Sequence, residues 1–202
     1  MYWIFASLLI FAIFCLWHRI EVKLRVKKQE EIEAAFWQRE AEANNVRRKP
    51  IDHLDYIKIP KDLHFDLLPD HVELPGIEKT VSDLREERIL NLTGYTNTDL
   101  KLKYGTANIT ELTKYDSNFT ALVTTLQKWA DILLDNEYEK EAVEIMEFLV
   151  SIEADIGKTY RLLGKYYLKT DLEKYETLIQ KADNLRSLNK PYIVQSIKDL
   201  KE

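Results

Sequence analysis

The amino-terminal part of the chain is apolar, and its polarity changes abruptly after residue 18. No charged residue lies between Trp3 and Trp17, and a cluster of basic residues follows. At about 1.5 Å per residue, a helix over 2–20 would be roughly 28 Å long, close to the ~30 Å hydrocarbon core of a bilayer. Because aromatic rings prefer the membrane–water interface, the two tryptophans suit a spanning helix. The pattern predicts a transmembrane anchor at 1–20.

A cleaved export signal or a lipoprotein leader fits this run poorly. No basic segment precedes it, and the bulky pair Trp17–His18 stands where a signal peptide has small residues. A lipoprotein leader needs a small residue before its cysteine, but Phe14 precedes Cys15. A buried helix of a soluble domain usually keeps a polar face, which this run lacks. We therefore expect an uncleaved anchor.

The basic flank predicts the orientation of that anchor. This flank, residues 19–28, contains one acidic residue, Glu21, and five cations, which are Arg19, Lys23, Arg25, Lys27 and Lys28. The positive-inside rule places the flank and the following chain in the cytoplasm and the amino terminus outside. We expect this flank, with Trp3 and Trp17, to contact membrane lipid; the cations are equally consistent with a simple stop-transfer flank. With this orientation, the N-x-T sequons at Asn91, Asn108 and Asn118 are not expected to be glycosylated.

Residues 21–49 predict a charged juxtamembrane helix. Acidic residues gather near its start and Arg47 near its end, which matches the helix dipole, and Pro50 terminates the pattern. Its apolar residues form only a short stripe of Ile32, Phe36 and Trp37. That stripe suits docking on a partner, docking on the protein's own domain, or a partly exposed stalk.

Residues 50–78 hold four of the five prolines of the chain and show no helical period. Prolines at this density favour an extended backbone, yet the segment is too apolar for a free linker. We expect an extended strap that lies over a helical domain. His53, His64 and His71 stand here among aspartates, but no recognised metal-ligand spacing occurs, and we predict no metal site.

Short helices are predicted over 79–116 from their start and stop signals. Thr80 or Asp83 would begin the first helix and Gly94 would end it; Thr98 and Gly105 would bound the second. A capping box at Asn108-x-x-Glu111 would begin another short turn. Asp116 or Ser117 would then cap a long helix that opens the last region, 117–202.

Two halves of that last region repeat with a shift of 34 residues. Leu126-x2-Trp129-Ala130-x2-Leu133 recurs as Tyr160-x2-Leu163-Gly164-x2-Tyr167, with a small residue at the same place in each half. A small residue lets a second helix approach closely. Ala142-x3-Met146 corresponds to Tyr175-x3-Ile179 if the second turn is one residue shorter.

This pattern resembles the tetratricopeptide repeat, a pair of antiparallel helices with the same period, over about residues 117–189. Tyr175 departs from the family, which prefers a small residue there, and two units are fewer than such arrays usually need. The flanking segments and the final helix would then act as caps. A generic helical bundle with accidental periodicity is the alternative.

The resemblance implies protein or peptide binding along the first helix of each pair. The second of these helices carries four cations at helical spacing, which are Lys158, Arg161, Lys165 and Lys169. Gln127 and Asp131 would face them from the first unit. We predict that the cations and Gln127 bind acidic side chains or a carboxylate terminus; a solvated helix face has the same pattern.

Composition and motifs give no reason to expect an enzyme or a nucleic-acid-binding protein. The net charge is −5, which does not suit binding to nucleic acid. A single cysteine, in the apolar run, excludes an intramolecular disulfide framework. The sequence contains no P-loop, dinucleotide fingerprint, nucleophile elbow or HExxH motif. We therefore expect no catalytic activity and no cofactor.

Taken together, these features predict a mostly α-helical protein, since only five glycines and five prolines interrupt the chain. Its order of anchor, charged helix, strap and helical hairpins is similar to that of uncharacterised single-span bacterial membrane proteins. The leading hypothesis is a membrane-tethered adaptor that presents a helical-repeat surface to a cytoplasmic protein partner. The alternative is a structural subunit of a larger membrane complex, and a metal-dependent membrane enzyme is a third, less favoured possibility.

Overall fold

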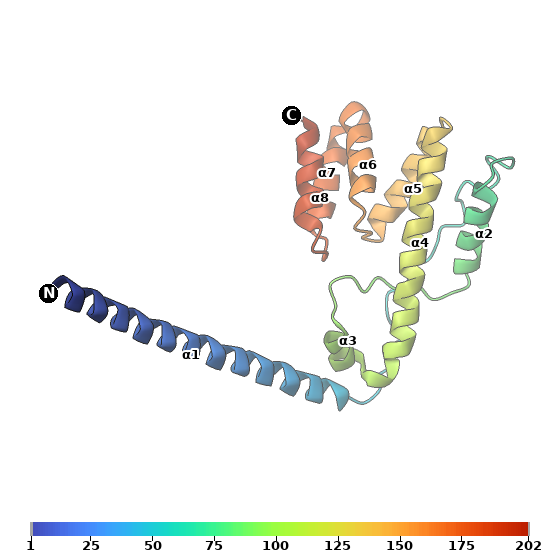
Figure 1. The fold of residues 1–202 in the computed structure, drawn as a ribbon. Helices are drawn as coiled ribbons and strands as arrows, with labels where there is room; N and C mark the ends of the chain where they lie inside the picture. The colour runs from blue at the N-terminus through green and yellow to red at the C-terminus, as the bar shows by residue number, and fades with distance from the viewer. Residues whose placement is uncertain (1, 202) are drawn as a thin grey trace. The chain divides into compact units, whose positions relative to one another are not determined.

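The structure is a computed structural model that describes residues 2–201, except for the side chains of Tyr2, Ile4–Ile10 and Ala12. It confirms the prediction of a mostly helical protein, and the described residues form no strand (Figure 1). The helices are α1 (Tyr2–Asn44), α2 (Leu74–Leu84), α3 (Asn97–Tyr104), α4 (Ile109–Asp135), α5 (Glu139–Ser151), α6 (Gly157–Thr170), α7 (Leu172–Asp183) and α8 (Lys190–Lys198). Two short 3-10 helices, η1 (Thr106–Asn108) and η2 (Asp199–Lys201), complete the structure.

The chain divides into two compact units. The first contains the chain up to Lys49 together with Asn97–Ala107, and the second contains Pro50–Thr96 together with the chain from Asn108 onward. Helices α1 and α3 therefore belong to the first unit, and α2 and α4–α8 to the second.

Helix α1 runs without interruption through the predicted boundary between anchor and stalk at residue 20. It ends at Asn44, several residues before Pro50, where the stalk helix was expected to end. Within the described part of the chain, no helix is long and apolar enough to cross a membrane. This result does not support the predicted anchor at 1–20, much of which falls on side chains outside the described residues, and the anchor stays a prediction.

The first unit is held together by contacts between the end of α1 and α3. Ala43 is fully buried, and the Glu40 carboxylate accepts hydrogen bonds from Thr98 and, at 3.0 Å, from Lys101. The hydrogen bond from Thr98 and the one from Lys101 lower the pKa of Glu40. Thr98 thus lies inside α3 and binds α1, rather than marking the start of α3 as expected, whereas Gly105 does follow the last residue of the helix.

In the second unit, residues 50–73 contain no helix and lie over the helical core. Ile59 and Leu63 are buried in that core, and the amide of Ile57 donates to the carbonyl of Ile89 at 2.9 Å. The ring of Phe65 meets the buried ring of Trp129 edge-on, with 5.0 Å between their centroids. Apolar side chains thus attach the extended segment to α4.

Several expected helix ends in 79–116 were wrong. Helix α2 begins at Leu74, so the extended strap expected over 50–78 ends at residue 73; Pro75 is tolerated because it lies in the first turn of the helix. The expected start signals Thr80 and Asp83 lie inside α2, which ends at Leu84 rather than at Gly94. The long helix α4 begins at Ile109, so Asp116 and Ser117 lie inside it. Tertiary contacts extended the helix through these capping residues.

Asp116 and Ser117 have other partners in place of the expected caps. The carboxylate of Asp116 accepts a hydrogen bond from the amide of Leu92 at 3.2 Å, and the hydroxyl of Ser117 donates to the carbonyl of Thr113 at 2.9 Å. Asn108 precedes α4 as expected but forms no side-chain cap hydrogen bond. The loop that holds Leu92 is therefore attached to α4 by a residue that the sequence had suggested as a helix start.

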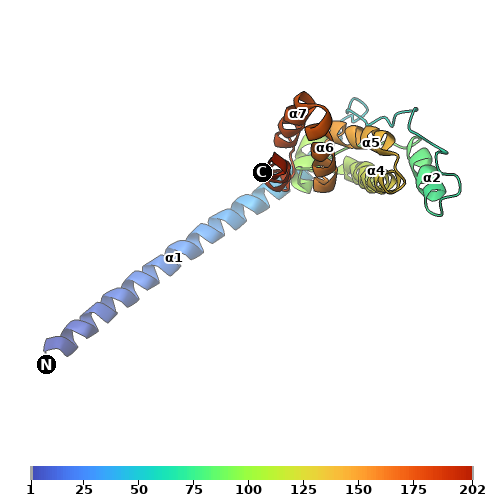
Figure 2. The same cartoon turned by 90° about the horizontal axis from the view of Figure 1, so that it is seen from above.

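Helices α4–α8 pack side by side, and Figure 2 shows α4, α5, α6 and α7 next to one another in the view from above. The paired positions of the sequence repeat in the first helix of each half are buried, whereas in the second helices Ala142, Met146 and Tyr175 are buried and Ile179 is partly buried. In α4 and α6 these positions are Leu126, Trp129, Ala130 and Leu133, and Tyr160, Leu163, Gly164 and Tyr167. The pattern of large and small residues therefore corresponds to buried helix faces.

The two helical turns differ in length. Three residues separate α4 from α5, but Asp171 alone separates α6 from α7, and its carboxylate caps α7 by accepting from the amides of Glu173 and Lys174. Tyr175 then occupies a fully buried position one turn into α7. Its hydroxyl donates to the carbonyl of Ile197 in α8 at 2.7 Å, so the large residue connects α7 to the last helix.

Candidate functional site

The four cations predicted to bind a partner all lie at exposed positions of α6. They recur every three or four residues, so helical geometry brings them to one side of α6. The opposite side buries Tyr160, Leu163 and Tyr167 in the core. The amphipathic pattern of α6 therefore orients the cations outward, but the structure divides them into three groups with different surroundings.

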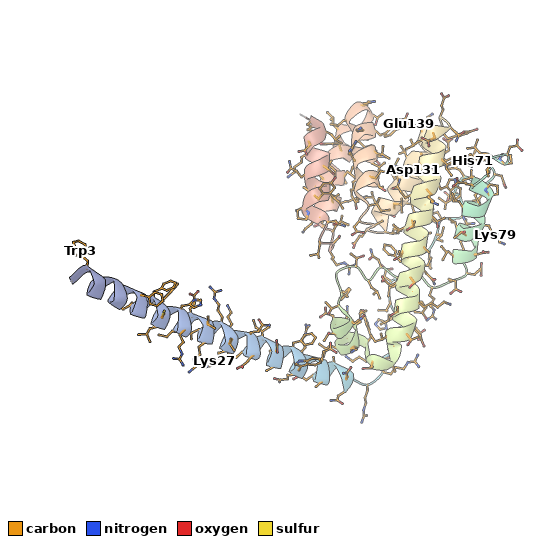
Figure 3. The ribbon with its side chains drawn as sticks, viewed as in Figure 1. Trp3, Lys27, His71, Lys79, Asp131 and Glu139 are labelled. Atoms are coloured by element: carbon orange, nitrogen blue, oxygen red, sulfur yellow. The ribbon has the colours of Figure 1, made fainter. Side chains whose placement is uncertain are left out.

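Lys158 and Gln127 are engaged in a network that joins α6 to α4. The ammonium of Lys158 lies 2.8 Å from the carboxylate of Asp131, whose place on α4 is labelled in Figure 3. The amide of Gln127 donates to the same carboxylate at 2.9 Å and accepts a hydrogen bond from the buried Thr159. These two residues of the predicted site are therefore occupied with contacts inside the domain.

Arg161 and Lys165 border a groove between α6 and α8 of about 430 Å³. The α8 side and the chain after it contribute Tyr192, Gln195, Ser196, Asp199 and Leu200. Neither cation forms an ion pair with any residue that the structure describes. The sequence analysis assigned the last helix only a capping role and therefore did not predict that it forms one side of the groove. No spacing in the sequence shows which helix α6 will contact.

Buried contacts of α8 with α6 and α7 position this wall. Ile193 and Ile197 are fully buried, and Pro191 stands in the first turn of α8, where a proline is tolerated. A Cβ added to Gly164 would lie 2.8 Å from Leu200 and 3.4 Å from Ile197, so glycine permits this close approach. The small residue of the repeat pattern therefore faces α8.

Lys169, the last of the four predicted cations, lies in the final turn of α6 and does not line the groove. A cation at this position is favourable for the helix dipole, whose negative end is at the carboxyl terminus. Its position is consistent with a contribution to helix stability rather than to a common binding surface with Arg161.

A second cleft, of about 530 Å³, lies between α5, α6 and α7. In it the carboxylate of Glu147 accepts hydrogen bonds from Tyr167 at 2.5 Å and from Lys174 at 2.8 Å. Partial burial of Glu147 opposes its charged form, but the hydrogen bonds from Lys174 and Tyr167 outweigh this effect and lower its pKa. Burial, followed by the contact with Glu147, raises the pKa of Tyr167.

Glu147, Tyr167 and Lys174 hydrogen-bond to one another, which is typical of a cluster that stabilises the fold. A tyrosine with a raised pKa is a poor nucleophile and a poor base at neutral pH. Two histidines of the extended segment also have partners: His64 lies 2.7 Å from Glu144, and the ring nitrogen of His71 accepts from the amides of Glu73 and Leu74. In the part that the structure describes, no three ligating side chains gather around a possible metal position.

The residues predicted at the membrane interface lie along α1. Trp3 and Trp17 are exposed, and Figure 3 shows Trp3 and Lys27 projecting from the helix. Arg25 pairs with Glu21 one turn earlier, and Lys27 lies 3.9 Å from a carboxylate oxygen of Glu31. Arg19, Lys23 and Lys28 are exposed.

The asparagines of the three sequons have structural positions in the second unit. Asn108 is fully buried, and Asn91 donates to the carbonyl of Ile152 at 3.0 Å and to that of Glu153 at 3.3 Å. Asn118 donates to the carbonyl of Arg88 at 3.0 Å. A glycan on Asn108 would be incompatible with this fold, because the attachment atom is inside the protein.

No protein family, curated protein or solved structure matches this chain. The resemblance to tetratricopeptide repeats and to single-span bacterial proteins therefore stays a prediction.

Proposed function

We propose that this protein is a membrane-tethered adaptor that presents its second unit to a cytoplasmic protein partner. The observation that carries the proposal is the position of Arg161 and Lys165, two exposed cations beside a groove and without an ion-pair partner in the described chain. Solvated lysines and arginines are common on helices, but here a second helix borders them and forms a concave surface. Concave surfaces of this kind suit peptide recognition.

The tether in this proposal is the apolar amino-terminal segment. It is supported by the absence of charge between Trp3 and Trp17 and by the five basic residues that follow in the sequence. The proposed orientation places the second unit, and the part of the first unit that follows the tether, on the cytoplasmic side, with the basic residues near anionic headgroups.

The repeat character of the second unit is also part of the proposal. The four motif positions are buried in both α4 and α6 at a shift of 34 residues. At a shift of 33, three buried residues of α5 correspond to buried residues of α7: Ala142 to Tyr175, Ile145 to Leu178 and Leu149 to Ala182. Stacked helix pairs of tetratricopeptide type would use the first helix of each pair, α4 and α6, for binding. The groove beside α6 is consistent with that arrangement.

Photo-crosslinking in intact membranes tests the proposed function. A photoreactive phenylalanine in place of Tyr192, an exposed aromatic residue that lines the groove, keeps both cations and should cross-link the full chain to one defined protein. The same group at the exposed Glu86, at the turn after α2, should not. Equal labelling from both positions, or none from position 192, would contradict the adaptor. Protease accessibility of a carboxyl-terminal tag in sealed vesicles checks the orientation independently.

A structural subunit of a larger complex is the second candidate, because α1 exposes an apolar stripe in its charged half. Ile32, Phe36 and Trp37 are 54%, 53% and 66% exposed, and large exposed apolar side chains in one place often mark an interface. A native gel of gently solubilised membranes separates the candidates. A subunit runs wholly in one large assembly, whereas an adaptor runs mostly on its own.

A further inference from the structure

We propose that the groove between α6 and α8 binds an extended acidic peptide segment of the partner, with acidic residues at alternate positions. This inference rests on the proposed function and names the chemistry of its binding site. It assigns a role to α8 residues that the sequence did not suggest, and it leaves Lys158, Gln127 and Lys169 out of the site.

The direction of the two helices defines the shape of the groove. A Cβ built on Gly157 would lie 3.6 Å from the ring of Tyr192, and one built on Gly164 would lie 2.8 Å from Leu200. Residue numbers therefore increase in the same direction along both helices, and α8 runs beside α6. The groove has Tyr192 at one end and Leu200 at the other, with Arg161 and Lys165 along its α6 side.

The spacing of the cations determines which peptide fits. Arg161 and Lys165 are four residues apart, which is about 6 Å along a helix axis. In an extended peptide, residues i and i+2 lie on one side and are about 6.6 Å apart. Two carboxylates in the pattern acidic-x-acidic therefore reach both cations, whereas adjacent acidic residues point to opposite sides of the peptide.

The other lining residues suit the remainder of such a segment. Tyr192 is 73% exposed, so its ring offers an apolar surface for a side chain two residues away from the nearer carboxylate. Gln195 and Ser196 donate hydrogen bonds to Asp199 and to the carbonyl of Ile193, so their side-chain oxygens are the groups left to accept from backbone amides of the peptide.

Asp199 is the single acidic residue that lines the groove, and it accepts a hydrogen bond from Gln195 at 2.6 Å. Its negative charge opposes an acidic ligand. The two cations still leave the lining with a net positive charge, which favours an acidic occupant.

Fluorescence anisotropy with the full chain in neutral detergent tests this inference. The probes are labelled octapeptides with a leucine followed by Glu-x-Glu, by adjacent glutamates, or by Lys-x-Lys. The Glu-x-Glu peptide should bind at least several-fold more tightly than the adjacent-glutamate peptide, and the lysine peptide should not bind. Its affinity should fall as the salt concentration rises.

Variants locate the binding site. The double change Arg161→Glu with Lys165→Glu should weaken the Glu-x-Glu peptide about tenfold or more, because attraction becomes repulsion at both cations. The matched double change Lys169→Glu with Lys198→Glu alters the net charge equally outside the groove and should change the affinity less than about twofold. Asp199→Asn should strengthen binding, and an increase in affinity cannot be produced by unfolding.

Three outcomes would overturn the inference: no binding of the Glu-x-Glu peptide, equal loss in the two double variants, or displacement by free glutarate at concentrations similar to that of the peptide. The last would identify a general anion site. The proposed function fails separately, if the photoreactive group at position 192 cross-links to no defined protein in membranes. A specific cross-linked partner whose binding is unaffected by the Arg161 and Lys165 reversals would retain the adaptor and reject this ligand.

Discussion

Gly164 of α6 lies directly against Leu200, so that a single added Cβ would come within 2.8 Å of the leucine side chain. Ile197 and Tyr175 close the other sides of this position at 3.4 Å and 3.8 Å. The absence of a side chain at residue 164 therefore permits the contact between α6 and the last helix, and with it the groove.

Replacement of Gly164 by leucine should lower the free energy of unfolding by about 1–3 kcal/mol, because the new side chain overpacks a closed site. Gly164→Ala should have a smaller effect, since Leu200 ends in a flexible side chain and alanine favours helix. Gly76→Ala is the control, because no atom lies within 4 Å of an added Cβ there. Chemical denaturation measures all three, and a neutral Gly164→Leu would contradict the close packing.

Removal of the Tyr175 hydroxyl should loosen the last helix. Tyr175→Phe keeps the ring but loses the hydrogen bond to the carbonyl of Ile197, at a cost of about 1 kcal/mol in the free energy of unfolding. Hydrogen exchange should increase in α8 more than in α5. Tyr166→Phe, on a partly exposed face of α6, is the matched change and should leave exchange in α8 unaltered.

Gly105→Ala should destabilise the first unit more than Gly94→Ala destabilises the second. Both glycines have a positive φ, +88° and +87°, so each alanine carries a conformational cost of about 1–2 kcal/mol. At Gly105 the added Cβ would also lie 2.4 Å from the carbonyl oxygen of Arg47, whereas at Gly94 the nearest atom is the Arg186 Cβ at 3.0 Å.

Hydrogen exchange in α3 measures the effect of Gly105→Ala, because that helix would separate from α1. Exchange in α4 should be unchanged by the same substitution. Comparable protection of α3 in the wild type and in the Gly105→Ala variant would show that the backbone tolerates the added methyl group.

Glu147→Gln should reduce stability in a pH-dependent manner. The folded-state pKa of Glu147 is below its usual value of 4.5, so its stabilising contribution is complete above that value and is lost as the pH falls through the folded pKa. We expect a loss of about 1 kcal/mol at pH 7, reduced by the partial exposure of the side chain. The difference from the wild type should shrink as the pH falls below 4.5 and through the folded pKa.

Thermal unfolding across this pH range measures the difference. Glu86→Gln, at an exposed turn, is the control and should match the wild type at each pH. A constant deficit for Glu147→Gln from pH 7 down to the pH at which the wild type unfolds would show that lost packing, rather than lost charge, causes the effect.

Helix boundaries show where sequence reasoning failed. The capping residues Asp116 and Ser117 are good helix starts in isolation, yet both lie within α4. Local signals compete with burial, and the buried positions Leu112 and Phe119 extend the amphipathic pattern of α4 across them. Pro75 contributed to the prediction of an extended backbone over 50–78, but it lies in the first turn of α2. A proline interrupts a helix only when it falls after the first turn.

The sequence by itself determined that the chain is mostly helical, that 50–78 combines prolines with apolar residues, and which positions of α4 and α6 are buried. The periodic spacing of apolar residues decides which positions of a helix are buried, because each helix buries the side on which its apolar residues lie. Only the tertiary structure decided which of the four predicted cations form an ion pair within the domain and which line a groove. Lys158 approaches Asp131 and Arg161 approaches α8 because of how the helices pack, and residues distant in sequence supply those neighbours.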